Sequence, residues 1–576
     1  MAVRKGMVVQ QDVAVPMRDG TVLRADVWLP GESGQYPILI YRSPYGKTEE
    51  EAYNDRTFRH ALEHGYALVV QDVRGRYRSG GAFSPYANER KDGYDTVEWA
   101  AGQPWSNGSV GMIGLSYPGA VQWLAAIETP PHLKAVSPAM SFRSLRHFLY
   151  FGGVFEAAWT GWIYKDMIPD AVVKLGLPGP RTYQEACAEY ERQAAVFAGT
   201  LPMLSMDLLE GVAPYYYEWL KTPPEDPAWD WGEIQDHYAE VKAAVLNLSG
   251  WHDEPYGSLG AVTGFTGLVA AGNPRTRLII GPWTHGAYET ELTRSGDREF
   301  GAAAAINYDD VVLGWMDCHV KEDGKACAEC GSPVRIFVMG DNRWREAQEW
   351  PLPDTRYTEL FLAGGQEKGS LVWEGAGEAS ERAFTSDPEN PVTDSFGTNF
   401  GAYDLRSLAD REDVLTFETE ALDEDLEVTG PIRAEIFASS EAPDFDLYVK
   451  ILDVAPDGTA YNLMSPGSEV LRASYRFQGK PRALLSPGET AKLGFNNLVT
   501  SNTFKKGHRI RVCICASWYP IYARNLQTGE SEVYSAATRK ARITIHLGGA
   551  TPSRLILPVI PRQASAAPVL GMRAAA

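Results

Sequence analysis

Short apolar strands alternate with helix-like segments in the first 140 residues, and this alternation constrains the fold more than any other feature of the sequence. "TVLRADVWL" alternates apolar and polar residues with a period of two, whereas "YPILIYR" and "YALVVQD" are short apolar runs. "YDTVEWAAGQ" has instead the pattern of a helix. Strands that alternate with helices are typical of βαβ units, in which helices cover a largely parallel sheet. The chain is therefore predicted to begin with an α/β domain.

The rest of the sequence divides into further parts. Residues 143–240 contain long helix-compatible stretches rich in Trp, Tyr, Leu and Met, which predicts a helical insertion. Strand patterns resume at "AVLNLSG" and "RTRLIIG". Beyond the α/β part, "IRAEIFASS" and similar segments alternate apolar and polar residues between turn residues, as in a β-sandwich. A chain of 576 residues is too long for one core. The predicted parts are an α/β domain (1–142 and 241–345), a helical cap (143–240), a β domain (346–562) and a tail (563–576).

The charge and hydropathy of the chain argue against several classes of partner. A formal net charge of −20 would repel nucleic acids and anionic membranes, so neither is expected to bind. The start "MAVRKGMVVQQDV" lacks the apolar run of a signal peptide, and no apolar run of about 18 residues occurs anywhere. We therefore expect a cytoplasmic protein that neither binds nor spans a membrane.

Six cysteines are too few for a disulfide framework in a chain of this length. Cys513 and Cys515 lie two apart in a strand pattern and are interpreted as packed thiols. Cys318, Cys327 and Cys330 have part of the spacing of a zinc site, but no second C-x-x-C or H-x-x-x-H motif follows them. We favour a surface loop with free thiols and leave metal binding by these three cysteines open.

The stretch "MIGLSYPGA" places Ser116 where a predicted strand ends and a predicted helix begins. A serine on such a sharp turn is often a nucleophile, and the backbone N–H of the next residue often binds the oxyanion. Proline has no N–H, so at position 117 it would remove that donor. At position 118 it falls in the first helical turn, where the N–H has no intrahelical acceptor. Pro118 is therefore compatible with an oxyanion donor at Tyr117.

The base and acid that such a serine needs can be sought by their positions. On a sheet of this kind they follow the serine in the order acid, then histidine, each on a loop after a strand. His285, in "LIIGPWTHGAY", and Asp253, after "AVLNLSGWH", meet this demand. Taken singly, a G-x-S is usually a turn, a loop histidine a surface residue, and an aspartate after a strand a helix cap. Their joint order and strand-end positions predict a catalytic triad of Ser116, Asp253 and His285.

Several motifs together are similar to one family. "GLSYPG", "SGWHDEP", "GPWTHG", "YRSPYGK" and "DVRGRYRSGG" resemble the bacterial cocaine esterase-like serine hydrolases, relatives of the X-prolyl dipeptidyl-peptidases and α-amino-acid ester hydrolases. The resemblance runs over nearly the whole chain. It implies an α/β-hydrolase core, an inserted helical cap after about the sixth strand, a C-terminal jelly roll and no cofactor or metal. It also implies that the Tyr45 hydroxyl joins the Tyr117 N–H in the oxyanion hole.

The residues around the predicted pocket depart from the family in part. Glu254 and Pro255 follow Asp253, where family members often have a small or aromatic residue. Glu254 could bind a substrate ammonium group, although we favour a solvated loop charge. Trp159 and Trp162 are similar to aromatic residues that line family pockets, and packing within the cap is the alternative.

The "DVRGRYRSGG" loop lacks both the G-K-[ST] ending and the G-x-G-x-x-G pattern of phosphate-binding loops. Asp72, Arg74 and Arg76 are therefore interpreted as a structural ion-pair loop near the site.

These observations predict a serine hydrolase that cleaves small-molecule carboxylic esters through an acyl-enzyme. The alternatives are an X-prolyl dipeptidyl-peptidase, an α-amino-acid ester hydrolase or an acyltransferase on the same scaffold. A glycan-binding protein with an inactive hydrolase part is a further alternative, against which the complete triad argues. Activity should fall as His285 becomes protonated, near its ordinary pKa of about 6.5. The sequence leaves open the natural substrate and whether the protein forms a homodimer.

Overall fold

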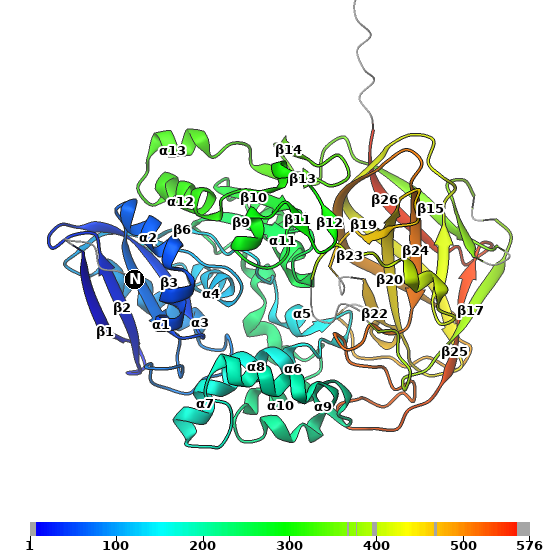
Figure 1. Cartoon of the computed structure of the whole chain (residues 1–576), viewed down its shortest axis with the longest axis horizontal. Coiled ribbons are helices and arrows are strands. Elements are labelled where there is room, and N and C mark those ends of the chain that lie inside the picture. Colours follow the sequence, from blue (N-terminus) through cyan, green and yellow to red (C-terminus); the bar gives the residue numbers. More distant parts are fainter. Residues whose placement is uncertain are drawn as a thin grey trace, which may run out of the picture.

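The structure is a computed structural model that describes residues 7–561, apart from residues 366–367, 376, 394–399, 466–468 and 478. The predicted tail, 563–576, lies outside the described residues. Figure 1 shows an α/β part coloured blue to green beside a β-rich part coloured yellow to red. A group of cyan to green helices, α6 to α10, lies along one side of the molecule next to both parts.

A ten-stranded sheet forms the centre of the α/β part. The seven strands in the order β4-β3-β5-β6-β9-β10-β13 are parallel, and antiparallel strands complete both edges. In sheet order the strands are β1 (Val8–Pro16), β2 (Val22–Leu29), β4 (Ala67–Asp72), β3 (Tyr36–Ser43), β5 (Ser106–Met112), β6 (Leu133–Val136), β9 (Ala244–Gly250), β10 (Thr276–Gly281), β13 (Val334–Val338) and β14 (Arg343–Ala347).

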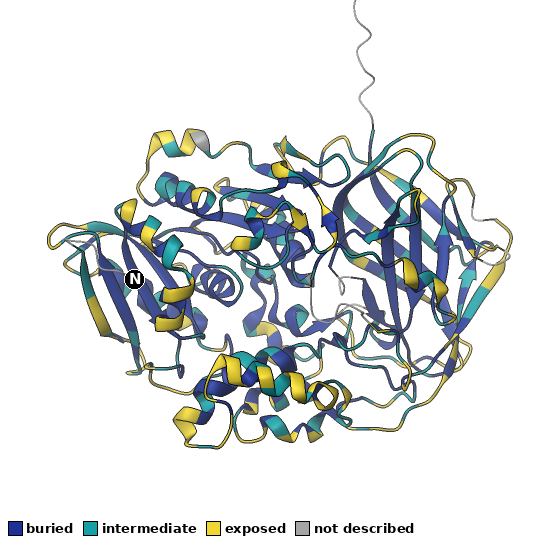
Figure 2. Cartoon of the chain, viewed as in Figure 1, coloured by how far each residue is buried: buried dark blue, intermediate teal, exposed yellow. Residues whose placement is uncertain are grey.

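Helices cover both faces of this sheet, which explains why its strands read as continuous apolar runs. On β4, Ala67 and Val69 join the core beneath α3 and α4, whereas Leu68 and Val70 join the core beneath α2 and α12. Inner strands such as β4 and β9 are dark blue, and therefore buried, in Figure 2, whereas the edge strands β1 and β14 are largely half-buried or exposed. The helices of this part are α1 (Lys47–Tyr53), α2 (Asp55–Glu63), α3 (Glu89–Ala101), α4 (Tyr117–Ala126), α11 (Pro255–Ala270), α12 (Tyr308–His319) and α13 (Gly324–Glu329). A small antiparallel pair outside the sheet consists of β11 (Arg294–Ser295) and β12 (Arg298–Glu299).

Residues 143–240, here called the cap segment, are inserted between β6 and β9. Their aromatic side chains share one core with helices α3 and α4, and their backbone also reaches the β-rich part, where Ala158 N donates to Ile521 O at 3.1 Å. The elements are α5 (Leu145–Leu149), β7 (Tyr150–Phe151), β8 (Val154–Phe155), α6 (Trp159–Trp162), a π-helical turn η1 (Ile163–Met167), α7 (Ile168–Leu175), α8 (Tyr183–Arg192), α9 (Ala194–Gly199) and α10 (Pro214–Lys221).

The β-rich part, here called the β domain, has the predicted alternation of buried and exposed positions. In β25, Ile543 and Ile545 are buried while Arg542 is exposed, and the inward side chains of several strands form one apolar core. The strands are β15 (Arg356–Ala363), β16 (Gly369–Val372), β17 (Ser380–Ser386), β18 (Leu415–Glu418), β19 (Leu426–Ser440), β20 (Asp446–Val454), β21 (Ala460–Asn462), β22 (Val470–Arg472), β23 (Ala491–Phe504), β24 (Arg509–Cys515), β25 (Ala541–Leu547) and β26 (Arg554–Ile560).

The α/β part and the β domain are joined by backbone hydrogen bonds as well as by side chains. Met339 N donates to Ser501 O at 3.0 Å, and Thr503 N donates to Met339 O at 2.8 Å. The buried guanidinium of Arg298 donates to Asp453 and Asn502 of the β domain, at 3.3 and 3.1 Å. The junction is therefore packed and hydrogen-bonded like the interior of a domain.

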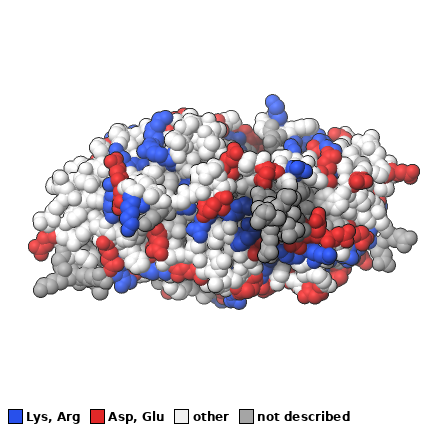
Figure 3. All heavy atoms as spheres, turned by 90° about the horizontal axis from the view of Figure 1, so that it is seen from above, with Lys and Arg blue, Asp and Glu red and all other residues white. Residues whose placement is uncertain are grey.

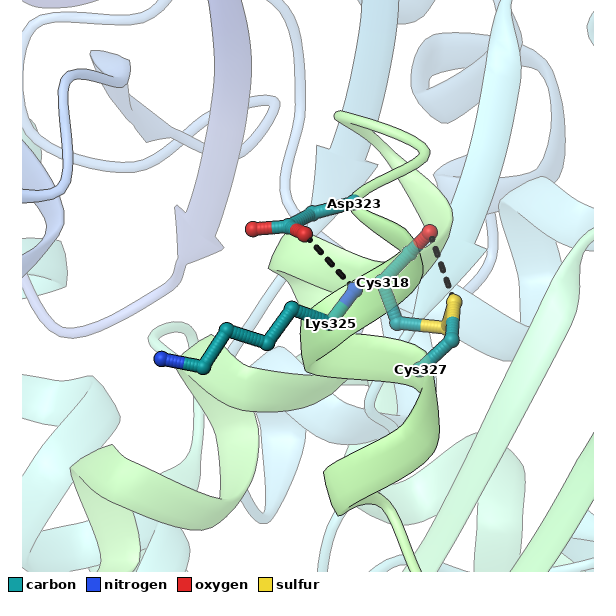
Figure 4. Close-up of a disulfide and its surroundings, with 4 residues drawn as sticks. All are labelled: Cys318, Asp323, Lys325 and Cys327. Atoms are coloured by element: carbon teal, nitrogen blue, oxygen red, sulfur yellow. Dashed lines mark hydrogen bonds between the residues drawn. A yellow bond between two sulfur atoms is a disulfide. The ribbon is translucent and has the colours of Figure 1, made fainter.

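The prediction of free thiols at the three clustered cysteines is wrong in part. Cys318, near the end of α12, and Cys327, in α13, form a disulfide, which Figure 4 shows. The chain turns back between the two helices, and this brings the Cα atoms of the two cysteines to 4.6 Å although they are nine positions apart in sequence. Cys330 is not disulfide-bonded. Cys513 and Cys515 are buried thiols, as predicted.

Acidic and basic side chains are interspersed over the face seen in Figure 3, so the net charge of −20 is not gathered into one patch there. Among the described residues, every helix is too short or too polar to cross a membrane.

Candidate active site

Ser116 lies on a sharp turn between the central strand β5 and helix α4. Its backbone has φ 65° and ψ −127°, a conformation that side-chain-bearing residues rarely adopt. The turn is tight because the helix starts against the loop after β6. A Cβ on Gly119 would lie 2.5 Å from the carbonyl oxygen of Ala139, which itself accepts a hydrogen bond from Ser116 N. The glycine thus permits the close approach that holds the serine at the edge of the sheet.

Helix α4 begins at Tyr117, with Pro118 in its first turn, as predicted. The first N–H groups of a helix have no intrahelical acceptor, so the Tyr117 N–H is available for another partner. The side chain of Tyr117 is buried and turned toward the core. Its hydroxyl accepts from Tyr86 N at 2.9 Å and donates to Glu89 at 3.2 Å. Only the backbone of Tyr117 is therefore suited to face a reacting group.

Asp253 and His285 follow the parallel strands β9 and β10 at the same edge of the sheet as Ser116. His285 Nδ1 lies 2.6 Å from Asp253 Oδ1. The other carboxylate oxygen accepts from the Ser249 hydroxyl at 2.6 Å, and Glu254 N donates to Oδ1 at 2.7 Å. Asp253 is fully buried. A carboxylate held in this way fixes the tautomer of the imidazole, leaving Nε2 to accept a proton.

Two negative charges act on the His285 imidazole. Burial alone would lower its pKa, but the carboxylates of Glu254 and Asp253 outweigh burial and raise the pKa to about 9. The pKa near 6.5 expected from the sequence is therefore wrong. The sequence analysis did not reveal this upward shift of the His285 pKa, because it interprets Glu254 as a solvated charge with little effect on the imidazole.

Glu254 is partly buried, and its Oε2 atom reaches no solvent and no hydrogen-bonding partner among the described groups. Burial raises its pKa to about 7. The interpretation of Glu254 as a solvated loop charge is therefore wrong. Glu156, in the loop after β8, is a second buried carboxyl group, and no sequence pattern points to it. It is 1% exposed, and its Oε2 atom lacks a described partner. Burial and the charge of Glu254 hold its pKa well above the ordinary value, although a hydrogen bond with Tyr522 lowers it in part.

Tyr45 follows strand β3, the neighbour of β5, so it emerges beside Ser116. Its backbone N–H donates to the Ser43 hydroxyl at 3.1 Å, and that hydroxyl donates to the buried carboxyl of Glu50 at 2.6 Å. The Tyr45 hydroxyl accepts from the indole N–H of Trp162 at 3.2 Å. The sequence resemblance suggests Trp162 as a pocket residue. In the structure Trp162 bonds to Tyr45, the tyrosine that the resemblance assigns to the oxyanion hole.

Aromatic side chains of the cap segment pack on Tyr256 of helix α11, which in turn contacts His285. Trp159 stacks on Phe148 with ring centroids 4.0 Å apart, and Tyr256 contacts both Trp159 and His285. Trp159 is only 6% exposed, and its indole N–H donates to Phe148 O at 2.8 Å. This favours packing as the main role of Trp159, the alternative that the sequence left open.

Comparisons with known proteins bear on the family and the fold of the chain. Residues 19–287 match the X-Pro dipeptidyl-peptidase (S15 family), and residues 329–556 match the X-Pro dipeptidyl-peptidase C-terminal non-catalytic domain. The chain is 33% identical to cocaine esterase from Rhodococcus sp. strain MB1 Bresler, over 96% of this chain and 99% of that protein.

Two solved structures are similar over almost the whole chain. An α-amino acid ester hydrolase has a TM-score of 0.81 at 24% identity and covers 97% of this chain and 98% of its own. An aminopeptidase from a marine sediment Thaumarchaeota archaeon also has a TM-score of 0.81 at 24% identity, with 97% of this chain and 99% of its own covered. The shared architecture is an α/β-hydrolase-like core with a large central sheet and a C-terminal sheet domain.

Proposed function

The chain belongs to the family of cocaine esterase-like serine hydrolases, and we propose that Ser116, Asp253 and His285 are the residues with which it hydrolyses carboxylic esters. The observation that carries this proposal is the 2.6 Å hydrogen bond between His285 and Asp253, at the sheet edge that also bears Ser116 on its strained turn. Together these features match the requirements of a base-activated serine.

In the proposed mechanism, the Ser116 hydroxyl attacks the ester carbonyl while His285 Nε2 takes its proton. The tetrahedral oxyanion accepts hydrogen bonds from the Tyr117 N–H and the Tyr45 hydroxyl. The imidazolium then protonates the leaving alcohol as the C–O bond breaks, which leaves an acyl-enzyme. Water, deprotonated by His285, attacks the acyl group in the same way and releases the carboxylic acid and free Ser116.

Active-site labelling combined with kinetics tests this assignment. Wild-type protein is incubated with a fluorophosphonate probe and assayed on p-nitrophenyl acetate. Ser116→Ala should lose both labelling and turnover, whereas Ser109→Ala, on the neighbouring strand β5, should keep both. Retained labelling of the Ser116→Ala variant would contradict the assignment of the nucleophile.

The buried carboxyl pair Glu254 and Glu156 favours a second candidate, an ester hydrolase or aminopeptidase that selects substrates with a protonated amine. The Oε2 atom of each lacks a hydrogen-bonding partner among the described groups, and an ammonium group beside them would donate to these atoms and favour the charged forms of the carboxyl groups. The p-nitrophenyl esters alone cannot separate the candidates, but methyl alaninate and methyl propionate can, because they differ only in the amine. If the pair binds ammonium, the alaninate should be preferred and Glu254→Gln should remove that preference. Equal preference ratios in both proteins would exclude this candidate.

Activity on Ala-Pro-p-nitroanilide would further distinguish a peptidase from an esterase. Transfer of the acyl group to an added alcohol would identify an acyltransferase.

We also propose that the cap segment, 143–240, covers the pocket with residues such as Trp162 and sets acyl specificity. Its support is the hydrogen bond from Trp162 to Tyr45 and the contact of Trp159 with Tyr256, the residue of helix α11 that contacts His285. The division into an α/β domain (1–142 and 241–345) and a β domain (346–562), and the jelly-roll topology of the latter, remain predictions of the sequence and the resemblance. A cytoplasmic location and the lack of nucleic-acid or membrane partners likewise stay predictions of the sequence, which leaves a homodimer open.

A further inference from the structure

The hydrogen bond between Trp162 and Tyr45 has a fixed direction. An indole N–H can only donate, so at 3.2 Å the Tyr45 oxygen must be the acceptor. The hydroxyl proton of Tyr45 must then point elsewhere, and no other described group forms a hydrogen bond with that hydroxyl. A tyrosine hydroxyl that already accepts a hydrogen bond is a better donor, because bonds in a chain polarise one another.

The protonation state of Tyr45 is consistent with a donor role. Burial, assisted by the charge of Asp166, holds its pKa well above the ordinary value, while the Trp162 bond lowers it in part. The hydroxyl therefore keeps its proton throughout the working pH range. The contribution of Trp162 acts in the opposite sense to burial, as expected for a group that makes the hydroxyl a stronger donor.

Arg76 binds both segments that carry the Trp162–Tyr45 pair, namely the loop after β3 and the turn that follows helix α6. Its Nε donates to Pro44 O at 2.7 Å, directly before Tyr45. Its Nη1 and Nη2 donate to Met167 O and Asp166 O of the π-helical turn that follows Trp162, at 2.8 and 2.9 Å. Arg76 is 1% exposed, and its distance to the Asp170 carboxylate is 3.5 Å. The sequence analysis interprets Arg76 as part of a local ion-pair loop. That interpretation is incomplete, because the Arg76 guanidinium chiefly donates to backbone carbonyl groups of two distant segments.

We propose that Trp162 is a positioning residue that orients the Tyr45 hydroxyl as a hydrogen-bond donor, so that the oxyanion hole is completed only by the cap segment. Arg76 holds the cap segment and the Tyr45 loop at the spacing this bond requires. This inference rests on the proposed function, since it assumes that Tyr45 stabilises the oxyanion.

A double-mutant cycle tests the inference. Trp162→Phe keeps an aromatic ring but removes the N–H, and Tyr45→Phe removes the hydroxyl on which the N–H acts. With p-nitrophenyl acetate, Trp162→Phe should lower kcat about three- to tenfold, the rate equivalent of one neutral hydrogen bond, and leave KM nearly unchanged. In the Tyr45→Phe background the same change should alter kcat by less than about twofold, because its target is gone.

Trp159→Phe is the matched control, because its indole N–H bonds to the backbone carbonyl of Phe148 and not to Tyr45. Whatever its effect on kcat, that effect should be the same in both backgrounds. Thermal unfolding of all variants checks that each is folded.

Several outcomes would overturn the inference. Equal losses for Trp162→Phe in both backgrounds would mean that Trp162 acts through packing or substrate contact. A second such outcome is that Trp162→Phe leaves kcat unchanged while Tyr45→Phe lowers kcat strongly. That result would keep Tyr45 as an oxyanion donor but show that Trp162 does not position it. An unchanged kcat for Tyr45→Phe would instead refute the proposed oxyanion hole itself, while Ser116 labelling would still report on the nucleophile.

Discussion

Two carboxyl groups act on the His285 imidazole, and they do so in different ways. Asp253 accepts a hydrogen bond from it and fixes its orientation, whereas Glu254 acts through its charge. Because both charges favour the imidazolium, much of the enzyme at neutral pH holds His285 in the form that cannot accept the serine proton. The negative charge of Glu254 thus lowers activity toward neutral esters at neutral pH. A substrate cation bound beside Glu254 would balance that charge.

The pH dependence of activity follows from this arrangement. The reactive imidazole is neutral, and its pKa lies at about 9, so kcat/KM for a neutral ester should rise from pH 7 to pH 9 and level off above. Glu254→Gln removes one negative charge, so the imidazolium becomes less favourable and its pKa falls. The half-maximal pH should move down by about one unit, and activity at pH 7 should increase.

Glu412 is an exposed residue of the β domain, so Glu412→Gln removes an equal charge away from the site. This control should leave the pH profile of kcat/KM unchanged. An unchanged half-maximal pH in Glu254→Gln would show that Glu254 does not act on His285.

Removal of the Tyr45 hydroxyl is a second change at the level of single residues. Tyr45→Phe should lower kcat about 10²- to 10³-fold without unfolding the protein, the loss typical of one oxyanion donor. Steady-state kinetics with p-nitrophenyl acetate and a thermal unfolding curve measure the two effects separately. A loss of kcat accompanied by an equal loss of folded protein would contradict this prediction.

Among the elements, the start of helix α4 decides whether the site can form. The first turn of the helix packs directly on the loop after β6, where a Cβ on Gly119 would lie 2.5 Å from the Ala139 carbonyl oxygen. Neither partner can move freely, because one is helix backbone and the other accepts the Ser116 N–H.

Gly119→Ala should therefore destabilise the fold by about 1–3 kcal/mol through overpacking and reduce kcat/KM by displacing the serine. Gly314→Ala is the matched control within helix α12, where a Cβ would meet nothing within 4 Å. It should stabilise the fold by about 0.5–1 kcal/mol, because alanine is the better helix former. Thermal unfolding and ester kinetics distinguish the two variants, and equal melting temperatures would refute the packing argument.

Across the whole molecule, the α/β part and the β domain share buried polar contacts that should make them unfold together. Arg298→Ala would remove the guanidinium beside the buried Asp453 carboxylate, which keeps its bonds to His508 and Asn502, so the expected cost is about 1–3 kcal/mol. Differential scanning calorimetry should show one transition at a clearly lower temperature than in the wild type. Arg406→Ala, which breaks an exposed pair with Asp404, should shift the transition little. A separate early transition of one part would contradict the expected coupling.

The sequence predicted what depends on order along the chain, and missed what depends on packing between distant segments. The parallel sheet, the turn at Ser116 and the pairing of Asp253 with His285 follow from strand ends meeting at one edge. Glu156 and Glu254 were missed or misinterpreted because burial of a loop carboxyl depends on how the cap segment docks. The bonds from Trp162 to Tyr45, and from Arg76 to two backbone segments, also arise only when residues 32 to 117 positions apart come together.

The bridge between Cys318 and Cys327 provides an internal indicator of where this protein resides in the cell. It closes a short ring, and such a ring adds about 2–3 kcal/mol by restricting the unfolded chain. Glutathione and thioredoxin keep most thiols of the cytosol reduced, so the link would persist only if it resists them or if the protein matures elsewhere. Alkylation of freshly lysed cells, followed by intact-mass measurement, would show through the number of capped sulfurs whether the link is closed in the cell.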